Sequence, residues 1–397
     1  MNTSSRPNLA ILVAITAVGP MALNIYIPSM PGIQQLFATD YATVQLTLTL
    51  YLAATAIAQL FVGPLSDRFG RRPVVLTGMV LFTLASIAAL AATSINQLIL
   101  ARMLQAIGAC TGIALSRAMV RDMYAQDAAA SQMAYIMMAM VVAPMLAPAL
   151  GGYLDVLFGW RASFMVLTAV GLLVIFWAWY ALHETHFQLR PFPGPAGLIG
   201  NYVRLLHVPL FVSYAATLAF SSGMFFAFLA GAPYIMINLM ERSPGEYGVL
   251  FIVISLGYMS GNFLSGRLSQ RLGVERMITL GCGIGVSGAV LLFSLSGVMQ
   301  PVALFGPMVM ITFSNGLTMP NATAAAVGAK PGMFGTASGL VGFIQLAVGA
   351  LTTIAVGLLQ EHFAGAMSAV ILCSGLIALS SFLIGRRLQQ HSTIGLH

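Results

Sequence analysis

Charged residues are scarce in this chain of 397 residues. Asp, Glu, Lys and Arg make up 7% of it, whereas 59% of the residues are hydrophobic and the mean hydropathy is +0.91. Soluble globular domains carry about 25% charged residues, so this composition excludes an ordinary soluble protein. We therefore expect the chain to fold within a lipid bilayer.

Long polar segments are also few. Apolar runs of roughly 20 residues, the length that a membrane-spanning helix needs, recur along the whole chain. The first begins near Leu9 and is too long for the apolar part of a signal peptide, so it is expected to remain as a span. Twelve spans are expected, at about 9–30, 43–62, 74–92, 97–120, 132–154, 162–182, 209–231, 247–265, 277–296, 302–323, 335–358 and 366–384. The short loops exclude a sensor with a soluble output domain.

The spans lack the residue types that intramembrane catalysis requires. They hold no histidine and no lysine, and the acids fall at their edges. An intramembrane hydrolase would need paired acids or an activated serine within the spans, so we do not expect an enzyme. Cys110, Cys282 and Cys373 each lie in an apolar run and are expected to be packing residues rather than a disulfide framework. No metal or cofactor is expected.

The basic residues are spread singly over the loops, although the net charge is +7. This distribution argues against nucleic-acid binding and fits the positive-inside rule. Placing both termini in the cytoplasm puts fourteen of the seventeen basic residues on the inner side. The opposite topology would invert that ratio.

The segment from Gly63 to Pro73 concentrates charge, with three arginines and one aspartate between two apolar runs. It is expected to be a short polar turn at a membrane face. A weaker copy runs from Leu268 to Gly273, 203 residues later, which predicts two similar halves. The polar, Pro- and Gly-rich stretch 183–208 is the expected connector. The predicted domains are an N-terminal six-helix bundle (1–182), the connector (183–208) and a C-terminal six-helix bundle (209–397).

Arg102 lies inside the fourth predicted span. An arginine there costs about 2.5 to 3.5 kcal/mol on insertion scales and usually marks function. It shares a helix face with Gln105. The alternative is that its side chain snorkels to the outer interface.

Span five is expected to bend. Pro144 and Pro148 remove helical hydrogen bonds, and Gly151 and Gly152 allow a neighbouring helix to approach closely. A kinked packing helix without further function is the alternative. A methionine stripe in the same span suits an adaptable binding surface, and polar and aromatic stripes continue in spans seven and eight, although such stripes are more often ordinary packing. The expected cavity residues are Asn24, Tyr26, Tyr51, Gln105, Met137, Met140, Ser221, Phe225, Tyr258, Asn262 and Asn315.

These motifs resemble the major facilitator superfamily, and within it the Bcr/CflA subfamily of bacterial drug and proton antiporters. The residues that carry the resemblance are the 63–73 segment, 24–31 in span one, 117–122 after span four, the span-five prolines, 223–225 and 334–339. The resemblance implies a major facilitator fold in the bacterial inner membrane. It also implies a cytoplasmic gate, in which the 63–73 segment latches onto the start of span eleven, at 335–338. The expected gate residues are Gly63, Asp67, Arg68, Gly70 and Arg71.

One departure from the family concerns the proton site. Family members commonly carry an aspartate in span one, and this chain has Asn24, which cannot take up a proton. The resemblance ties Arg102 to proton coupling. Asp155 is the acid closest to the expected cleft, and either Asp155 or an edge acid such as Asp122 carries the proton, or the coupling is unusual. A cleft lined by neutral polar and aromatic groups, with few charges, favours uncharged or zwitterionic substrates over strongly cationic ones.

The sequence thus predicts a monomeric, proton-linked exporter of small amphipathic or aromatic compounds that works by alternating access. The alternative is a metabolite facilitator or symporter of the same fold, which differs in its response to an imposed pH gradient.

Overall fold

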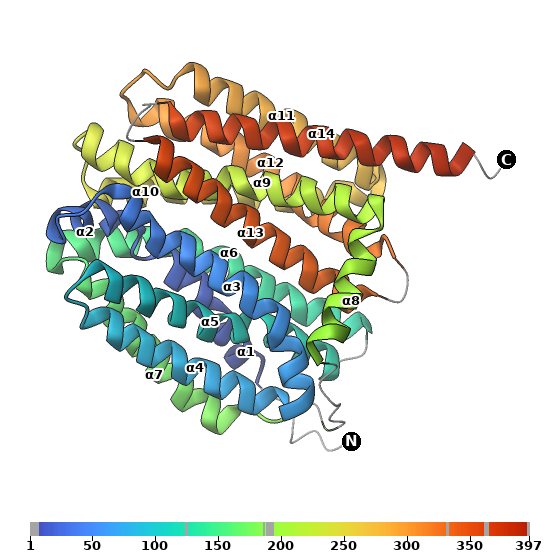
Figure 1. Ribbon diagram of the computed structural model, residues 1–397, viewed down its shortest axis with the longest axis horizontal. Coiled ribbons are helices and arrows are strands. Elements are labelled where there is room, and N and C mark those ends of the chain that lie inside the picture. Colours follow the sequence, from blue (N-terminus) through green and yellow to red (C-terminus); the bar gives the residue numbers. More distant parts are fainter. Residues whose placement is uncertain are drawn as a thin grey trace. The chain divides into compact units, whose positions relative to one another are not determined.

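The computed structural model describes residues 8–123, 126–185, 187, 194–330, 333–360 and 365–394. All regular elements within these residues are helices (Figure 1). The first set is α1 (Leu9–Asn24), η2 (Ile27–Ser29), α2 (Met30–Leu36), α3 (Tyr41–Phe69), α4 (Arg71–Leu90), α5 (Ile95–Met123), α6 (Gln126–Phe158) and α7 (Arg161–Ala181). The second is α8 (Gly194–Leu206), α9 (Pro209–Pro233), η3 (Tyr234–Leu239), α10 (Pro244–Leu272), α11 (Val274–Ser294), α12 (Pro301–Gly328), α13 (Phe334–Gln360) and α14 (Ala366–Ile394).

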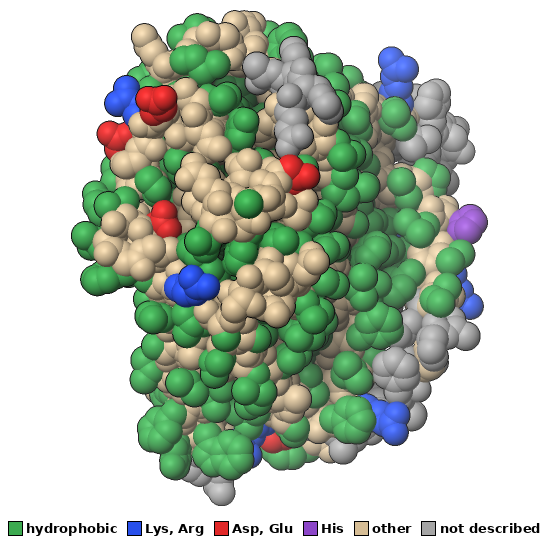
Figure 2. Space-filling model, turned by 60° about the vertical axis from the view of Figure 1, so that its left-hand side comes forward, with side chains coloured by type: hydrophobic (Ala, Val, Ile, Leu, Met, Phe, Trp, Pro, Cys, Tyr) green, Lys and Arg blue, Asp and Glu red, His purple; other side chains and the backbone are tan. Residues whose placement is uncertain are grey.

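The predicted all-α membrane fold is confirmed. Among the described residues, eleven helical segments are long and apolar enough to cross a membrane, and α6 is apolar over Val142–Phe158. Together they account for the twelve expected spans. Exposed apolar side chains are abundant on these helices, and hydrophobic side chains are spread over the face shown in Figure 2. Such a surface suits contact with lipid rather than water.

The chain divides into two compact units. One comprises Met1–Pro193 with Ser243–Val249, and the other comprises Gly194–Arg242 with Leu250–His397. The boundary between 193 and 194 falls within the expected connector. Part of that connector is helical, because α8 begins at Gly194 and buries Leu205 in the core of the second unit.

Small residues allow close helix packing in the first unit, where α5 contacts α1, α3 and α4. A Cβ atom on Gly108 of α5 would lie 2.5 Å from the carbonyl oxygen of Gly78 on α4. Helices in a membrane gain little from hydrophobic burial against one another, so their association depends on such close contact and on interhelical hydrogen bonds. Glycine at these positions therefore brings α4 and α5 together.

In the second unit, α9 is the central helix and packs against α12, α13 and α14. Most of its residues are buried, including the small polar residues Ser213, Thr217 and Ser221. Phe211, Tyr214 and Leu218 of α9 lie in a buried cluster with residues of α11, α12, α13 and α14.

The turn expected over 63–73 is much shorter than the sequence suggested. Helix α3 continues through Pro64 to Phe69, and α4 begins at Arg71, so Gly70 alone separates them. Gly70 has φ +95° and ψ 155°, a conformation accessible to glycine. The charged side chains of this segment are therefore held on two rigid helix ends.

Candidate functional site

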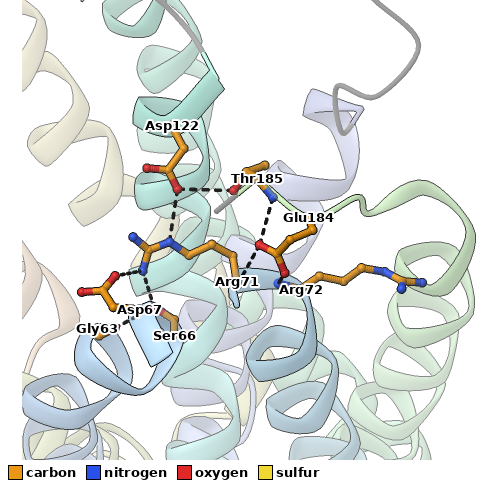
Figure 3. Close-up of polar contacts among 8 residues, drawn as sticks. All are labelled: Gly63, Ser66, Asp67, Arg71, Arg72, Asp122, Glu184 and Thr185. Atoms are coloured by element: carbon orange, nitrogen blue, oxygen red, sulfur yellow. Dashed lines mark hydrogen bonds and ion pairs between the residues drawn. The ribbon is translucent and has the colours of Figure 1, made fainter. Parts of the chain in front are cut away.

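A cluster of charged and polar side chains surrounds the Gly70 junction in the first unit (Figure 3). Arg71 is buried, with a relative exposure of 8%. Its Nη1 lies 2.7 Å from Asp67 Oδ1, and its Nε lies 3.2 Å from Asp122 Oδ2. Nη1 also donates to Ser66 Oγ. One guanidinium thus connects the end of α3, the start of α4 and the end of α5.

The sequence reasoning missed Glu184, which follows α7. Its carboxylate accepts hydrogen bonds from the backbone amides of Arg71 (2.9 Å), Arg72 (3.0 Å) and Thr185 (2.9 Å). The first two amides belong to the first turn of α4, where an anion is favourable because the helix dipole is positive there. Two arginines at a helix N-terminus are themselves unfavourable, and that was the available signal for an acid from elsewhere in the chain.

Gly70 is required by the same contact. A Cβ atom there would lie 2.6 Å from Glu184 Oε2. Gly63 differs, because within its own unit no described atom would lie within 4 Å of such a Cβ atom. Arg68 is exposed and lies over the ring of Phe69, 5.1 Å from its centroid. The expected latch partner, 335–338, belongs to the second unit, and the latch stays a prediction.

Arg102 is fully buried, with a relative exposure of 0%, so the snorkelling alternative is wrong. Its Nη1 donates to the carbonyl oxygen of Ala22 (2.9 Å) and to Gln105 Oε1. Its Cζ lies 4.1 Å from the ring centroid of Tyr26 and 4.3 Å from that of Tyr51. The guanidinium is therefore held between two aromatic rings contributed by different segments of the unit.

Further hydrogen bonds hold this aromatic cage in place. The hydroxyl of Tyr26 lies 3.0 Å from Thr47 Oγ1, and the hydroxyl of Tyr51 donates to the carbonyl oxygen of Gly19 at 3.2 Å. Gln105 Nε2 donates to Ser86 Oγ at 2.7 Å. Three of the expected cavity residues, Tyr26, Tyr51 and Gln105, thus meet at Arg102.

The other expected residues of the first unit lie elsewhere. Asn24 is buried and donates back to the carbonyl oxygen of Pro20 at 2.8 Å. Asp155 on α6 is partly buried and lies beside Ser29 of η2, and Asp122 is paired with Arg71. Among the described residues, no acid forms an ion pair with Arg102. The three residues expected to couple protons therefore occupy three separate places.

Helix α6 carries the expected bending motif. Pro144 and Pro148 lie inside an unbroken helix. Gly151 is buried, and a Cβ atom on it would lie 1.6 Å from the carbonyl oxygen of Ile25. Gly152 is buried as well. Gly151 thus lets α6 approach the end of α1, whereas a Cβ atom on Gly152 would lie 2.3 Å from the carbonyl oxygen of Pro244, in the same unit.

The methionine stripe is described only in part. The sulfur of Met140 accepts a hydrogen bond from Arg117 Nη2 at 2.8 Å. The side chain of Met137 lies outside the described part of the structure.

The second unit holds five expected cavity residues on three helices. Ser221 on α9 is buried, and the ring of Phe225 lies 6.1 Å from that of Phe251. On α10, Asn262 Nδ2 donates to the carbonyl oxygen of Tyr258 at 3.0 Å. Asn315 on α12 is buried, and its Oδ1 accepts no hydrogen bond from the described residues. A cavity shared by the two units remains a prediction.

Comparison with known proteins identifies the family. The model of the Major Facilitator Superfamily matches residues 12–353. The chain is 30% identical over 377 residues to "Multidrug resistance protein D" of Escherichia coli (strain K12), covering 94% of both chains. It is 28% identical over 341 residues to the "Bicyclomycin resistance protein homolog" of Haemophilus influenzae, covering 85% of both.

The fold has solved counterparts. A bacterial homolog of the human lysosomal transporter Spinster, in an inward-facing conformation, matches with a TM-score of 0.77 over 96% of both chains, at 16% identity. At that identity the likeness concerns the fold alone. The chain is a multi-pass membrane transporter and belongs to the Major Facilitator Superfamily.

Proposed function

We propose that this chain exports small amphipathic or aromatic compounds, including drugs, from the bacterial cytoplasm in exchange for protons. It would lie in the inner membrane as a monomer, with both termini in the cytoplasm. The names of its relatives and its Bcr/CflA-like motifs support this function. The observation that carries it is the fully buried Arg102 in the fourth span, held between Tyr26 and Tyr51.

Placing an arginine within a membrane span is unfavourable in free energy, and this argues that Arg102 has a role in transport. A buried charge without a paired carboxylate is unfavourable, and packing alone would be served better by an apolar residue. Arginine does not release its proton in proteins. Arg102 therefore acts as a fixed positive charge, and an acid carries the transported proton.

Asp155 and Asp122 are the proposed proton carriers. Asp155 is partly buried on α6, next to the segment that follows α1. Asp122 is held by Arg71 at the Gly70 junction. Protonation of Asp122 would remove the charge that Arg71 attracts and would loosen the contact between α4 and α5. In this way proton uptake would alter the proposed gate formed by Gly63, Asp67, Arg68, Gly70 and Arg71.

Efflux from reconstituted vesicles tests this function. An aromatic dye is loaded with the protein into proteoliposomes, and dye movement is followed with and without an imposed pH gradient. We expect the gradient to drive accumulation, an uncoupler to abolish it, and Asp155→Asn to reduce it at least tenfold.

The same measurement separates the alternative. If the dye only equilibrates, and does so equally with and without the pH gradient, the protein is a facilitator. If the dye accumulates in the same direction as proton flow, the protein is a symporter. Either outcome would contradict proton-linked export.

A further inference from the structure

Three arginines of the first unit differ in what accepts hydrogen bonds from one edge of the guanidinium. This edge is formed by Nε and the adjacent terminal nitrogen. Arg161 fills this edge with backbone carbonyls: Nε donates to Leu90 (3.3 Å) and Nη2 to Ala92 (3.1 Å). Arg71 places its Nε against the carboxylate of Asp122. Arg102 differs from both, because its Nε and Nη2 find no hydrogen-bond partner among the described residues.

The free edge of Arg102 is a defined site rather than a loosely packed side chain. Nη1 is occupied by the carbonyl oxygen of Ala22 and by Gln105. The rings of Tyr26 and Tyr51 lie against the guanidinium, with their centroids 4.1 and 4.3 Å from Cζ. The two N–H groups that remain for a ligand are those at Nε and Nη2. These two N–H groups point in parallel and match the two oxygens of a carboxylate.

The uncompensated positive charge of Arg102 also favours an anionic ligand. Arg102 is 0% exposed, and no Asp or Glu among the described residues lies within ion-pair distance of it. Buried donors without a partner are unfavourable, and more so when they are charged. An incoming anion would satisfy the two hydrogen bonds and the charge together, which a neutral amide could not do.

We propose that the Nε and Nη2 edge of Arg102 binds the carboxylate of the transported compound, so that the substrates are small aromatic or amphipathic carboxylates. This inference rests on the proposed export function and narrows its substrate class. The aromatic cage holds the guanidinium in one orientation, and Gln105 holds its opposite edge. The side chain is enclosed in this structure, so the carboxylate reaches it in another state of the transport cycle.

The electrical consequence is specific. Exchange of a monovalent anion for one inward proton moves two charges per cycle in the same sense, whereas exchange of a neutral compound moves one. Transport of the carboxylate should therefore respond more steeply to membrane potential than transport of its amide.

A matched series of probes tests the proposal. 2-Naphthoate, 2-naphthamide and 2-naphthylmethylamine share one ring and differ in charge. In proteoliposomes with a fixed pH gradient, we expect kcat/KM for naphthoate to exceed that for the other two by about tenfold or more, the effect of one charge-assisted bidentate contact. In Arg102→Met the ratio of kcat/KM for naphthoate to kcat/KM for naphthamide should fall to about one, whatever the overall transport rate of that variant. Arg102→Lys keeps the charge but not the parallel pair of donors, and should retain only part of it.

Arg161→Met is the matched control, because the edge of Arg161 is already filled by carbonyls; it should leave the naphthoate preference unchanged. Equal transport of naphthoate and naphthamide by the wild type, or an unchanged preference in Arg102→Met, would overturn the proposal.

A binding measurement keeps the two proposals apart. The Nε–H resonance of Arg102, assigned by its loss in Arg102→Lys, should shift when naphthoate is added to the wild-type protein and should not shift with naphthamide. If no probe is transported but the resonance shifts, the anion site stands and the export function fails. If the chemical shift of the Arg102 Nε–H resonance does not change when naphthoate is added, the Nε and Nη2 edge binds no anion. The anion site is then refuted, even if one of the probes is transported.

Discussion

The two units contain the same backbone junction with different chemistry around it. Gly70 joins α3 to α4 with φ +95° and ψ 155°, and Gly273 joins α10 to α11 with φ +83° and ψ 156°. In each case the glycine amide donates to the carbonyl oxygen of the residue four earlier, Ser66 or Ser269, at 3.0 Å. The repeat seen in the sequence is therefore a repeat of backbone geometry.

The residues that follow each glycine separate the two junctions. Helix α4 begins with Arg71 and Arg72, which oppose the positive end of the helix dipole, and Glu184 compensates from another part of the chain. Helix α11 begins with Val274 and carries its own acid, Glu275, in the first turn. The first junction thus depends on tertiary contacts, whereas the second has its favourable charge within the helix.

The serines at the two junctions show the same contrast. Ser66 Oγ accepts a hydrogen bond from Arg71 in the first unit. In the second unit Ser269 Oγ lies 3.2 Å from Ser265 Oγ, which accepts from Asn321 at 2.8 Å. The serine of the first junction thus contacts a charged side chain, whereas the serine of the second contacts a neutral one. The same backbone geometry can therefore carry a charge-dependent function in one unit and not in the other.

Replacing Arg71 with the residue of the other junction should have the largest effect. Arg71→Val leaves Asp122 without its ion-pair partner, and the loss of a mostly buried partner destabilises by about 1 to 3 kcal/mol after allowance for the partial exposure of both acids. We expect transport to fall at least tenfold, measured in proteoliposomes, with a lower melting temperature in detergent.

The reciprocal change Val274→Arg is the control for Arg71→Val. It introduces an arginine next to Glu275, whose ion pair with Arg386 is exposed, and transport should stay within about twofold of the wild type, as for most exposed charges. Equal losses in the two variants would mean that the ionic cluster has no special role.

Alanine at the two glycines should give the next largest difference. Both positions have positive φ, so Gly70→Ala and Gly273→Ala each strain the backbone by about 1 to 3 kcal/mol. At Gly70 the new Cβ atom would also lie 2.6 Å from Glu184, whereas at Gly273 no described atom is within 4 Å. Gly70→Ala should therefore melt at the lower temperature. Similar melting temperatures would show that Glu184 moves aside without loss.

Neutralising the two acids should give the smallest effect. Glu184→Gln weakens three hydrogen bonds from backbone amides and should destabilise the protein by about 1 to 2 kcal/mol. Glu275 Oε2 lies 3.8 Å from Arg386 Nε, and both side chains are exposed. Glu275→Gln should therefore change the free energy of unfolding little, as is typical of surface ion pairs. Melting curves of the two variants at neutral pH make the comparison. A larger loss for Glu275→Gln would contradict the dipole argument.

Much of the fold could be predicted because its signals are local. Each span is a run of apolar residues that must satisfy its own backbone hydrogen bonds in lipid, and the Gly70 and Gly273 repeat is visible in the residues around it. The length of the polar turn could not be predicted, since helix α3 carries its charged residues through Pro64 to Phe69. Arg102 could also be singled out from the neighbouring sequence, because it is a single charged residue within an apolar run.

The partners of these residues depended on contacts between distant parts of the chain. Arg102 bonds to Ala22, 80 residues away, and Glu184 bonds to Arg71, 113 residues away. Nothing in the neighbouring sequence of either residue specifies such a partner.

The sequence by itself determined that this protein spans a membrane many times, repeats one helix junction and carries a charge where charge is unfavourable. Helix packing alone decided that Arg102 lies between two tyrosines with one edge free and that Glu184 completes the Gly70 junction. The reason is physical: apolar run length and glycine geometry act along a few consecutive residues, whereas charges in a low-dielectric interior are stabilised by whichever groups folding brings beside them.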